Sequence, residues 1–376
     1  MGVRLSWAVL PYDAALAAPL PTARGAIARR RGWYVACRGG GRIGLGEVTP
    51  WPAWGTETEA AAERALAALP SGVEAPETLD DVRACLTALG LASGGAAVWA
   101  GLEAALLDWL ARRFGQPLAT LLREGPGESA RQVAVAALIG AEPPELAAAR
   151  AAAAVAAGHR TVKLKLVGEQ DLARARAVRA AVGAAVALRL DANALWPDAD
   201  AALPDLLPFA EVAPEFFEQP LPAHDLAGLA ALSRRLPFPL AADEALGTAG
   251  AFDAAIAAGV PVLVCKPMVH GGLLAARDLI ERARAAGLRV VLSSSLDRGL
   301  GSAGVLHLAA AFAQETGCAG LGTVGLYADG GALAGLTPQD GCLPLPAGPG
   351  LGLSPAVPVL RDWLAGLDQL TGGHAT

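Results

Sequence analysis

The sequence predicts an α/β protein built on a parallel barrel with a smaller domain attached. Two observations predict this class. Short apolar segments alternate with alanine-rich helical segments over residues 133–324, as in a parallel sheet covered by helices. Ionisable residues recur along the same region at steps close to one strand–helix unit. A chain of 376 residues is long enough for a barrel and a second domain.

Composition excludes several classes of protein. With 53% hydrophobic and 18% charged residues, a long disordered stretch is not expected. The net charge of −6 argues against nucleic acid as the main partner. The five cysteines are scattered without a C-x-x-C pair, so we expect reduced thiols in a cytoplasmic protein. The N-terminus lacks a signal pattern. The uncharged stretch 84–102 is interpreted as two helix pieces around Ser93-Gly94-Gly95, not as a membrane span.

The first 60 residues are predicted to form strands. Residues 33–37 and 42–48 flank a glycine turn and predict a hairpin. From residue 57 to about 122 the pattern is helical. Apolar residues recur there at spacings of three, four and seven, which predicts one buried helix face: Trp99, Leu102, Leu106, Trp109, Leu110 and Phe114. The tail from about residue 325 is rich in Pro and Gly. We expect it to be irregular and to pack back onto the N-terminal region.

Eight strands are predicted in the barrel region. They are residues 133–139, 161–166, 187–191, 215–218, 239–243, 262–266, 289–293 and 320–324. Eight parallel strands separated by helices close into a barrel, whose site lies at the carboxyl ends of the strands.

The strongest signal is a run of ionisable residues near successive strand ends. From Lys165 the steps to Asp191, Glu218, Asp243 and Lys266 are 26, 27, 25 and 23 residues. A regular step places side chains at the same height on neighbouring strands, so we expect these five to converge.

Strand alternation sharpens this expectation. Residues two apart face the same way, so Lys163 and Lys165 share a face, and so do Arg189 and Asp191. Charges facing a barrel interior need partners. Three carboxylates without nearby His or Cys ligands favour a hard cation, Mg²⁺ or Mn²⁺; the alternative is a set of salt bridges to the lysines. Burial, Lys163 and a metal ion would all lower the pKa of Lys165 and suit it to act as a base.

These motifs resemble the muconate-cycloisomerase-like branch of the enolase superfamily. They are Lys163-x-Lys165, Asp191-x-Asn193, Glu218-Gln-Pro, Asp243-Glu244 and Lys266-Pro. The resemblance implies a modified TIM-type (β/α)7β barrel over residues 126–324. It also implies an α+β capping domain over residues 1–125, completed by 325–376. A lysine or histidine base acting with magnesium is the general pattern of enolase-type sites, so that pairing is a property of the family.

Within that branch, residues 266–272 and 293–301 are most similar to the o-succinylbenzoate synthase family. This implies a Mg²⁺-dependent lyase of menaquinone biosynthesis, which dehydrates a succinyl-hydroxycyclohexadiene carboxylate through a metal-stabilised enediolate. Lys165 would remove the proton and return it to the departing hydroxyl, with Lys163 beside it and Lys266 as a stabilising cation. The implied metal ligands are Asp191, Glu218 and Asp243. Glu244 and Asn193 would support them.

Other activities stay open on the same residues. Dipeptide epimerases of this branch carry an acidic element on the eighth strand, and residues 320–324 contain no carboxylate. This makes a dipeptide epimerase less favoured. The alternatives are an N-succinyl amino acid racemase, a dipeptide epimerase, a muconate-type cycloisomerase and a non-catalytic metal or ligand sensor. The expected partner is a small carboxylate, with no nucleic acid or membrane; an oligomer is compatible with the sequence.

Several residues have two interpretations. Ser293, Ser294 and Ser295 either donate hydrogen bonds to a substrate oxygen or close a strand as a turn. Arg189 pairs either with a site carboxylate or with a structural partner. His270 is interpreted as a loop histidine rather than a catalytic one. Trp51 and Trp54, with residues 20–25, resemble capping loops that cover the substrate. The pair Asp297-Arg298 is unusual and would alter the pocket rim.

Overall fold

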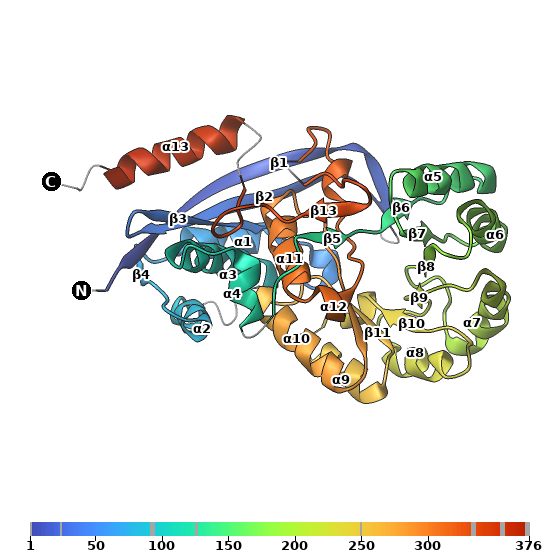
Figure 1. Cartoon of the computed structure of the whole chain (residues 1–376). Coiled ribbons are helices and arrows are strands. Elements are labelled where there is room, and N and C mark those ends of the chain that lie inside the picture. The colour runs from blue at the N-terminus through green and yellow to red at the C-terminus, as the bar shows by residue number, and fades with distance from the viewer. Residues whose placement is uncertain are drawn as a thin grey trace.

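A computed structural model describes residues 2–22, 25–90, 95–124, 127–248, 250–331, 336–353 and 358–372. Two main sheets organise these residues (Figure 1). An antiparallel sheet of four strands has the order β3-β2-β1-β4, and a parallel sheet of seven strands has the order β12-β11-β10-β9-β8-β7-β6. The predicted class, a β/α barrel with an α+β cap, is confirmed.

The antiparallel sheet is built around one long hairpin. Strands β1 (Arg4–Thr22) and β2 (Gly25–Gly39) pair along most of their length, and β3 (Arg42–Val48) pairs with β2. The short β4 (Val73–Glu74) pairs with the start of β1. Gly40 and Gly41 both have positive φ in the turn between β2 and β3, where glycine is the residue without steric cost. The predicted hairpin is confirmed.

The cap contains several helical segments, and the longest of them packs on this sheet. They are η1 (Pro52–Trp54), α1 (Glu59–Ala67), α2 (Leu79–Ala88), α3 (Ala96–Arg113) and α4 (Leu118–Arg123). Helix α3 lies so close to β3 that a Cβ on Gly46 would come 2.0 Å from the carbonyl oxygen of Gly101. The predicted face of α3 is buried at Leu102, Leu106 and Leu110. Burial is not confined to that face, because the helix lies between the sheet and the barrel and is buried nearly all round. Phe114, placed on that face, caps the helix and is 53% exposed.

The barrel strands alternate with helices on the outside (Figure 1). The strands are β6 (Ala137–Ile139), β7 (Thr161–Lys165), β8 (Ala187–Asp191), β9 (Phe216–Glu218), β10 (Leu240–Ala242), β11 (Val262–Cys265) and β12 (Arg289–Leu292). Strand β5 (Gln132–Ala134) precedes them and is not part of this sheet. The helices are α5 (Pro144–Ala156), α6 (Asp171–Val182), α7 (Ala199–Leu206), η3 (Leu207–Val212), α8 (Leu226–Ser233), η4 (Glu244–Leu246), α9 (Ala251–Ala258), α10 (Leu273–Ala285), α11 (Leu300–Ala311) and α12 (Ala313–Thr316).

Two predicted strands differ from the structure. The segment 133–139 is split: β5 pairs with a strand of the tail, and β6 pairs with β7. The segment 320–324 is not a strand, since it runs into the 3-10 helix η5 (Val324–Leu326). Single bridges from Ala319 to Val135 and from Gly320 to Ser293 join the two edges of the sheet instead. The barrel is closed at this point by these bridges, without a full strand, in a segment whose glycines weaken strand formation.

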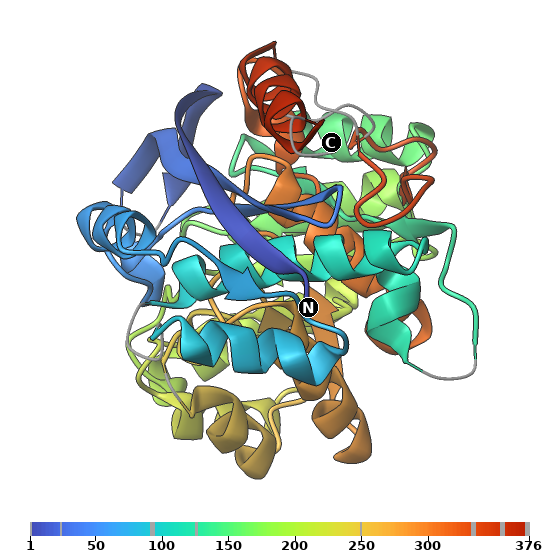
Figure 2. The ribbon, with the colours of Figure 1, turned by 90° about the vertical axis from the view of Figure 1, so that its left-hand side faces the viewer.

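The tail returns to the cap, as predicted. Strand β13 (Cys342–Pro344) pairs with β5, and Leu118 donates its N–H to the carbonyl of Gly350 at 2.8 Å. The expectation of an irregular tail is wrong for α13 (Pro358–Gly372), which lies near β1 (Figure 2). Among the described residues, no helix combines the length and the apolar character that a membrane crossing requires. Helix α2 ends at Ala88 and α3 begins at Ala96; residues 91–94 of the predicted turn lie outside the described residues.

Three buried acids join the cap to the barrel and tail, and we call Glu47, Glu103 and Asp108 the junction carboxylates. Glu47 on β3 accepts the backbone N–H groups of residues 298, 299 and 301 at the start of α11. Glu103 on α3 accepts those of residues 273 and 274 at the start of α10. Asp108 accepts N–H groups of residues 45 and 351. The first N–H groups of a helix lack partners within the helix, so Glu47 and Glu103 fasten the cap to the barrel by accepting them, and Asp108 fastens the cap to the tail.

Candidate active site

Strand register brings the predicted residues to one edge of the barrel. Lys165 pairs across the sheet with Asp191, and Asp191 pairs with Glu218. Asp243 and Lys266 each follow directly after the last residue of their strands, β10 and β11. Because neighbouring parallel strands end at the same height, the five side chains lie at the carboxyl edge of the sheet. The strand register therefore brings the five side chains together at one height, as expected from their spacing.

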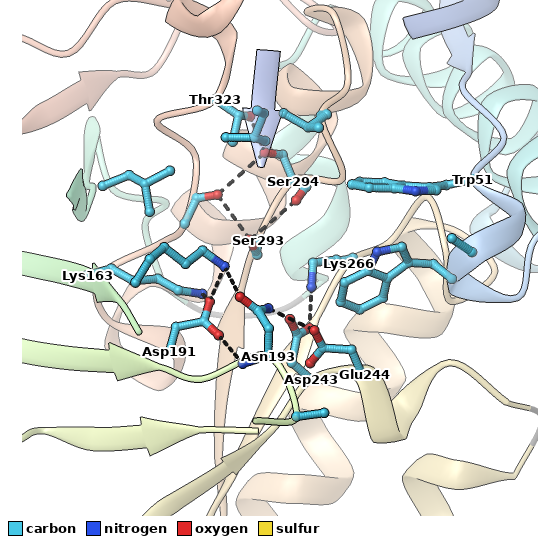
Figure 3. A pocket seen from close by; sticks show the side chains of 18 of the residues that line it. Trp51, Lys163, Asp191, Asn193, Asp243, Glu244, Lys266, Ser293, Ser294 and Thr323 are labelled. Atoms are coloured by element: carbon cyan, nitrogen blue, oxygen red, sulfur yellow. Dashed lines mark hydrogen bonds and ion pairs between the residues drawn. The ribbon is translucent and has the colours of Figure 1, made fainter. Parts of the chain in front are cut away.

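The lysines contact the carboxylates directly (Figure 3). The Nζ of Lys163 lies 2.8 Å from Asp191 Oδ2 and 2.6 Å from Glu218 Oε1. The Nζ of Lys165 lies 2.6 Å from the same Asp191 oxygen. On the other side, the Nζ of Lys266 forms an ion pair with Asp243 Oδ1. These salt bridges balance the buried charges of the site.

A second layer of hydrogen bonds holds these side chains. Asn193 Oδ1 accepts from Lys165 Nζ at 2.8 Å, and Asn193 Nδ2 donates to Glu244 Oε1 at 2.8 Å. The buried Gln219 accepts the N–H groups of Asp243 and Ala245 through Oε1. Asn193 and Gln219 both have positive φ, 46° and 40°, a backbone state that non-glycine residues adopt at a cost. Strain at two strand ends of one site is typical of functional sites.

The electrostatics of the acids differ although all three are buried. Burial, reinforced by the neighbouring charge of Asp191, raises the pKa of Glu218 to about 7. Burial also raises the pKa of Asp243, against the opposing effect of Lys266. Burial would raise the pKa of Asp191 as well, but Lys163 and Lys165 together hold it below its usual range. For Lys163 burial acts to lower the pKa, and the surrounding carboxylates outweigh it and raise the pKa. The direction of each pKa shift therefore depends on whether burial or the neighbouring ammonium groups have the larger effect.

The donor set fits a hard divalent cation by its chemistry. Carboxylate oxygens from three adjacent strands, without a thiolate or imidazole among them, are the ligands that Mg²⁺ prefers. In the described part of the chain, however, no three acidic, His or Cys side chains are close enough to hold one ion. Ammonium groups lie between the acids instead, since Lys163 bridges Asp191 and Glu218. A metal ion would have to displace these contacts.

A pocket of about 450 Å³ opens above these residues. Its polar wall contains Ser293, Ser294 and Thr323, and the Ser294 and Thr323 hydroxyls lie 2.6 Å apart (Figure 3). Most of the remaining wall is apolar and comes from both the cap and the barrel. Its apolar members include Leu20, Trp51, Trp54, Ala136, Leu138, Leu296 and Leu326. The pocket therefore combines a charged floor with largely apolar walls.

Two predicted residues do not join this group. Arg189 Nε donates to Glu215 Oε2 at 2.7 Å, and its Nη1 donates to the carbonyl of Cys318. Arg189 lies two residues before Asp191, so it shares that face of the strand but points to a layer farther from the mouth. Ser295 donates to Asp297 Oδ1 at 2.7 Å and does not line the pocket. Ser293 and Ser294 line it and also bond the carbonyl of Gly320, as the strand-closing interpretation predicts. Donation by these two serines to a substrate oxygen stays a prediction.

Three contacts at the site were missed by sequence reasoning. The side chain of Gln219 orients the backbone after β10. Gln219 belongs to the Glu218-Gln-Pro motif of the sequence, which predicted no role for it. His270 Nδ1 accepts the backbone N–H of Lys266 at 3.0 Å; burial and then Lys266 lower the pKa of His270 to about 3. Trp54 places its ring over the Lys266 ammonium, 3.6 Å from the ring centroid. The pair Asp297-Arg298 lies at the junction, where Arg298 Nη1 donates to Tyr34.

One sequence signal points to the site without any structure. Of the 30 Lys and Arg residues, 27 are arginine, and the three lysines are Lys163, Lys165 and Lys266. Every lysine of the chain therefore lies at this site. Arginine cannot lose its proton in proteins, whereas lysine can.

Fold and site together define the class. A family model described as "Enolase C-terminal domain-like" matches residues 146–358, more than half of the chain. The chain belongs to the enolase superfamily of enzymes, and its relatives include muconate-cycloisomerase-like proteins. The family resemblance seen in the sequence is confirmed.

Individual relatives carry different activities. Muconate cycloisomerase 1 of Rhodococcus opacus is 31% identical over 270 residues, covering 70% of this chain and 71% of that protein. An o-succinylbenzoate synthase of Mycobacterium ulcerans is 38% identical over 192 residues, 50% of this chain and 56% of that protein. A dipeptide epimerase from Enterococcus faecalis, solved with Mg and the dipeptide L-Leu-L-Tyr, has a TM-score of 0.82 at 25% identity and covers 94% of this chain and 100% of that one. Relatedness alone does not select one reaction.

Proposed function

We propose that this chain is a Mg²⁺-dependent o-succinylbenzoate synthase of menaquinone biosynthesis. It would dehydrate 2-succinyl-6-hydroxy-2,4-cyclohexadiene-1-carboxylate to 2-succinylbenzoate. The observation that carries the proposal is the placement of Lys165 and Lys266 on β7 and just after β11, with the carboxylate-bearing strands β8, β9 and β10 between them. A substrate carboxylate over those acids lies between two ammonium groups. The identity to the synthase of Mycobacterium ulcerans supports the same assignment.

Each residue has a role in this reaction. Asp191, Glu218 and Asp243 would hold Mg²⁺, whose charge favours loss of a proton beside the substrate carboxylate. Lys165 takes that proton from carbon and gives it to the departing hydroxyl. One C–H bond and one C–O bond break, a C=C bond forms, and water leaves. Lys266 stays protonated and stabilises the negative charge that develops on the carboxylate.

The pocket wall supports a substrate without a positive charge. Beyond the acids at the strand ends and Glu244, the described lining contains no carboxylate that could hold an ammonium group. In epimerases, acidic side chains that bind the amino group of the substrate are expected on the eighth strand. Here residues 320–323 contribute only Gly320, Gly322 and Thr323 to the pocket lining. The hydroxyls of Ser293, Ser294 and Thr323 can donate to ketone or carboxylate oxygens. These features fit a succinyl chain better than the amino end of a dipeptide.

The test is a direct assay on the purified protein. With Mg²⁺ we expect formation of 2-succinylbenzoate, and a chelator should abolish it, with recovery on adding back Mg²⁺ or Mn²⁺. Dipeptides and cis,cis-muconate, tested in parallel, should give no comparable turnover. Absence of 2-succinylbenzoate together with turnover of another carboxylate would replace the proposal. Absence of turnover on every carboxylate would favour a metal or ligand sensor.

Racemisation of N-succinyl amino acids is the second candidate, because lysines stand on both sides of the acids. Racemisation needs proton transfer on both faces of the substrate, whereas dehydration needs it on one. Lys266→Arg keeps the charge but not a transferable proton. It should abolish racemase activity and leave part of the synthase activity. Complete loss of the synthase activity would contradict the assigned role of Lys266.

A further inference from the structure

The three lysines of the site are held in different ways. Lys163 and Lys165 have side chains that are 20% and 29% exposed, and each contacts Asp191. The side chain of Lys266 is only 9% exposed. Its ammonium lies between Asp243 and the face of the Trp54 indole. Among the described residues, the other two lysines have no such ring over the ammonium.

Lys266 is also fixed at its backbone. Its N–H donates to His270 Nδ1 at 3.0 Å, and its carbonyl accepts the N–H of His270 at 3.0 Å. The turn after β11 is therefore closed around the residue from which the side chain leaves. A lysine side chain ordinarily has four rotatable bonds and a mobile end. Here both ends are restrained.

The loop that carries Trp54 is built to hold its ring in place. Trp54 donates its N–H to the carbonyl of Trp51 at 2.8 Å, and the two indoles lie 5.9 Å apart. Arg30 stacks on Trp51 at 4.7 Å from the ring centroid. Gly55 has φ 87°, and a Cβ there would come 2.4 Å from the carbonyl oxygen of Gly247. The loop thus rests on the turn that follows Asp243.

We propose that Trp54 is a positioning residue that seats the Lys266 ammonium, so that Lys266 acts as a fixed cation and not as a second carrier of protons. This inference rests on the proposed function, in which Lys165 transfers the proton. An aromatic face attracts a cation and does not accept its proton. An ammonium held over the ring, on a residue whose backbone is fixed by His270, does not swing toward the substrate carbon. Trp54 then biases the site toward one-face chemistry, dehydration, over two-face chemistry, racemisation.

The contact between the Trp54 ring and the Lys266 ammonium can be observed without any substrate. Lysine labelled with ¹³C at Cε gives three signals in this chain, because it contains three lysines. Each signal is assigned by a single Lys→Arg variant, and spectra are recorded with and without Mg²⁺. We expect the Lys266 ε protons upfield of the other two, because they lie over the indole. Trp54→Leu should remove that shift and Trp54→Phe should keep part of it. Gly55→Ala should weaken the shift with the indole intact.

Trp7→Leu is the matched control, since Trp7 lies on β1 of the cap and does not line the pocket. It should leave all three lysine signals unchanged. The proposed positioning of Lys266 by Trp54 would be overturned by an unshifted Lys266 signal in the unaltered protein, or by a shift that survives Trp54→Leu.

The consequence for chemistry is measured by α-proton exchange in D₂O with the two enantiomers of an apolar N-succinyl amino acid. We expect the unaltered protein to exchange one enantiomer much faster than the other. Trp54→Leu should reduce this preference by roughly 2- to 30-fold, the range to which loss of one cation–π contact corresponds, with Trp54→Phe in between. Equal exchange of both enantiomers by the unaltered protein would overturn the inference. Absence of all turnover would instead contradict the proposed function. The lysine spectra would still test whether Trp54 positions Lys266.

Discussion

Buried acids occupy two regions of this molecule, and they are satisfied in different ways. At the barrel mouth, Asp191, Glu218 and Asp243 contact lysine ammonium groups. At the junction, Glu47 and Glu103 accept hydrogen bonds from backbone N–H groups of barrel helices. Backbone donors are fixed by the fold, whereas a lysine side chain can give way to a metal ion or substrate. The same residue type therefore fastens domains in one region and is available for chemistry in the other.

A perturbed pKa does not separate the two regions. Burial raises the pKa of Glu103 at the junction to about 8, although backbone N–H groups oppose the change. Burial likewise raises the pKa of Glu218 at the mouth to about 7. Shifted pKa values mark candidate sites only as a probability. The nature of the partner, side-chain cation or backbone donor, is the better guide here.

The largest expected effect is at the mouth. Lys165→Met removes the proposed base and should lower kcat/KM for 2-succinylbenzoate formation by about 10²- to 10⁴-fold. Thermal unfolding should change little, because the side chain is partly exposed. Glu103→Gln, at the junction, is the matched control and should keep kcat/KM near that of the unaltered protein. Activity of Lys165→Met within tenfold of normal would remove Lys165 from the mechanism.

The next largest effect is expected at the junction, where a substitution should lower stability. Glu47→Ala leaves three backbone N–H groups near the start of α11 without their acceptor and deprives the Tyr12 hydroxyl of one as well. The free energy of unfolding should fall by about 2–4 kcal/mol, measured by urea denaturation. Glu47→Gln keeps one oxygen acceptor and should lose less. A loss below that of an ordinary surface substitution would show that Glu47 does not fasten the cap.

A smaller effect depends on pH. Because the folded-state pKa of Glu103 is raised from 4.5 to about 8, the folded protein binds this proton more tightly than the unfolded chain. Its contribution to stability is therefore full at low pH and is lost as pH rises between about 4.5 and 8. Glu103→Gln cannot lose a proton, so relative to the unaltered protein it should gain about 1–3 kcal/mol over that interval. Urea denaturation at pH 5 and pH 8.5 measures the difference. A difference that stays constant with pH would contradict the assignment.

The smallest effect lies on the polar wall of the pocket. Ser294→Ala removes a hydroxyl that bonds Thr323 and faces the substrate space. Loss of one neutral hydrogen bond of about 1 kcal/mol should raise KM roughly fivefold with kcat less affected. Steady-state kinetics on the cyclohexadiene substrate measure both constants. The buried Ser302, which bonds the carbonyl of Asp297 away from the pocket, offers a matched Ser→Ala control that should not change KM.

Much of the fold could be predicted from local pattern. The predicted strands 187–191 and 161–166 agree with the observed bounds to within a residue, since apolar runs between helices specify buried parallel strands. The prediction for segment 320–324 failed because its glycines carry little strand propensity and only two bridges close the barrel there. The prediction for helix α3 failed differently: its sequence showed one apolar stripe, but two neighbours bury it from opposite sides.

The sequence by itself determined the chemistry and the height of the site. Repeating strand–helix units of nearly equal length place Lys165, Asp191, Glu218, Asp243 and Lys266 on successive strand ends, because a covalent period becomes a spatial one in a barrel. Only the tertiary structure decided the rest. It sent Arg189 to a layer below the mouth and set Trp54 over Lys266. The contact of Trp54 joins segments whose separation follows no period, and it forms only when the cap docks on the barrel.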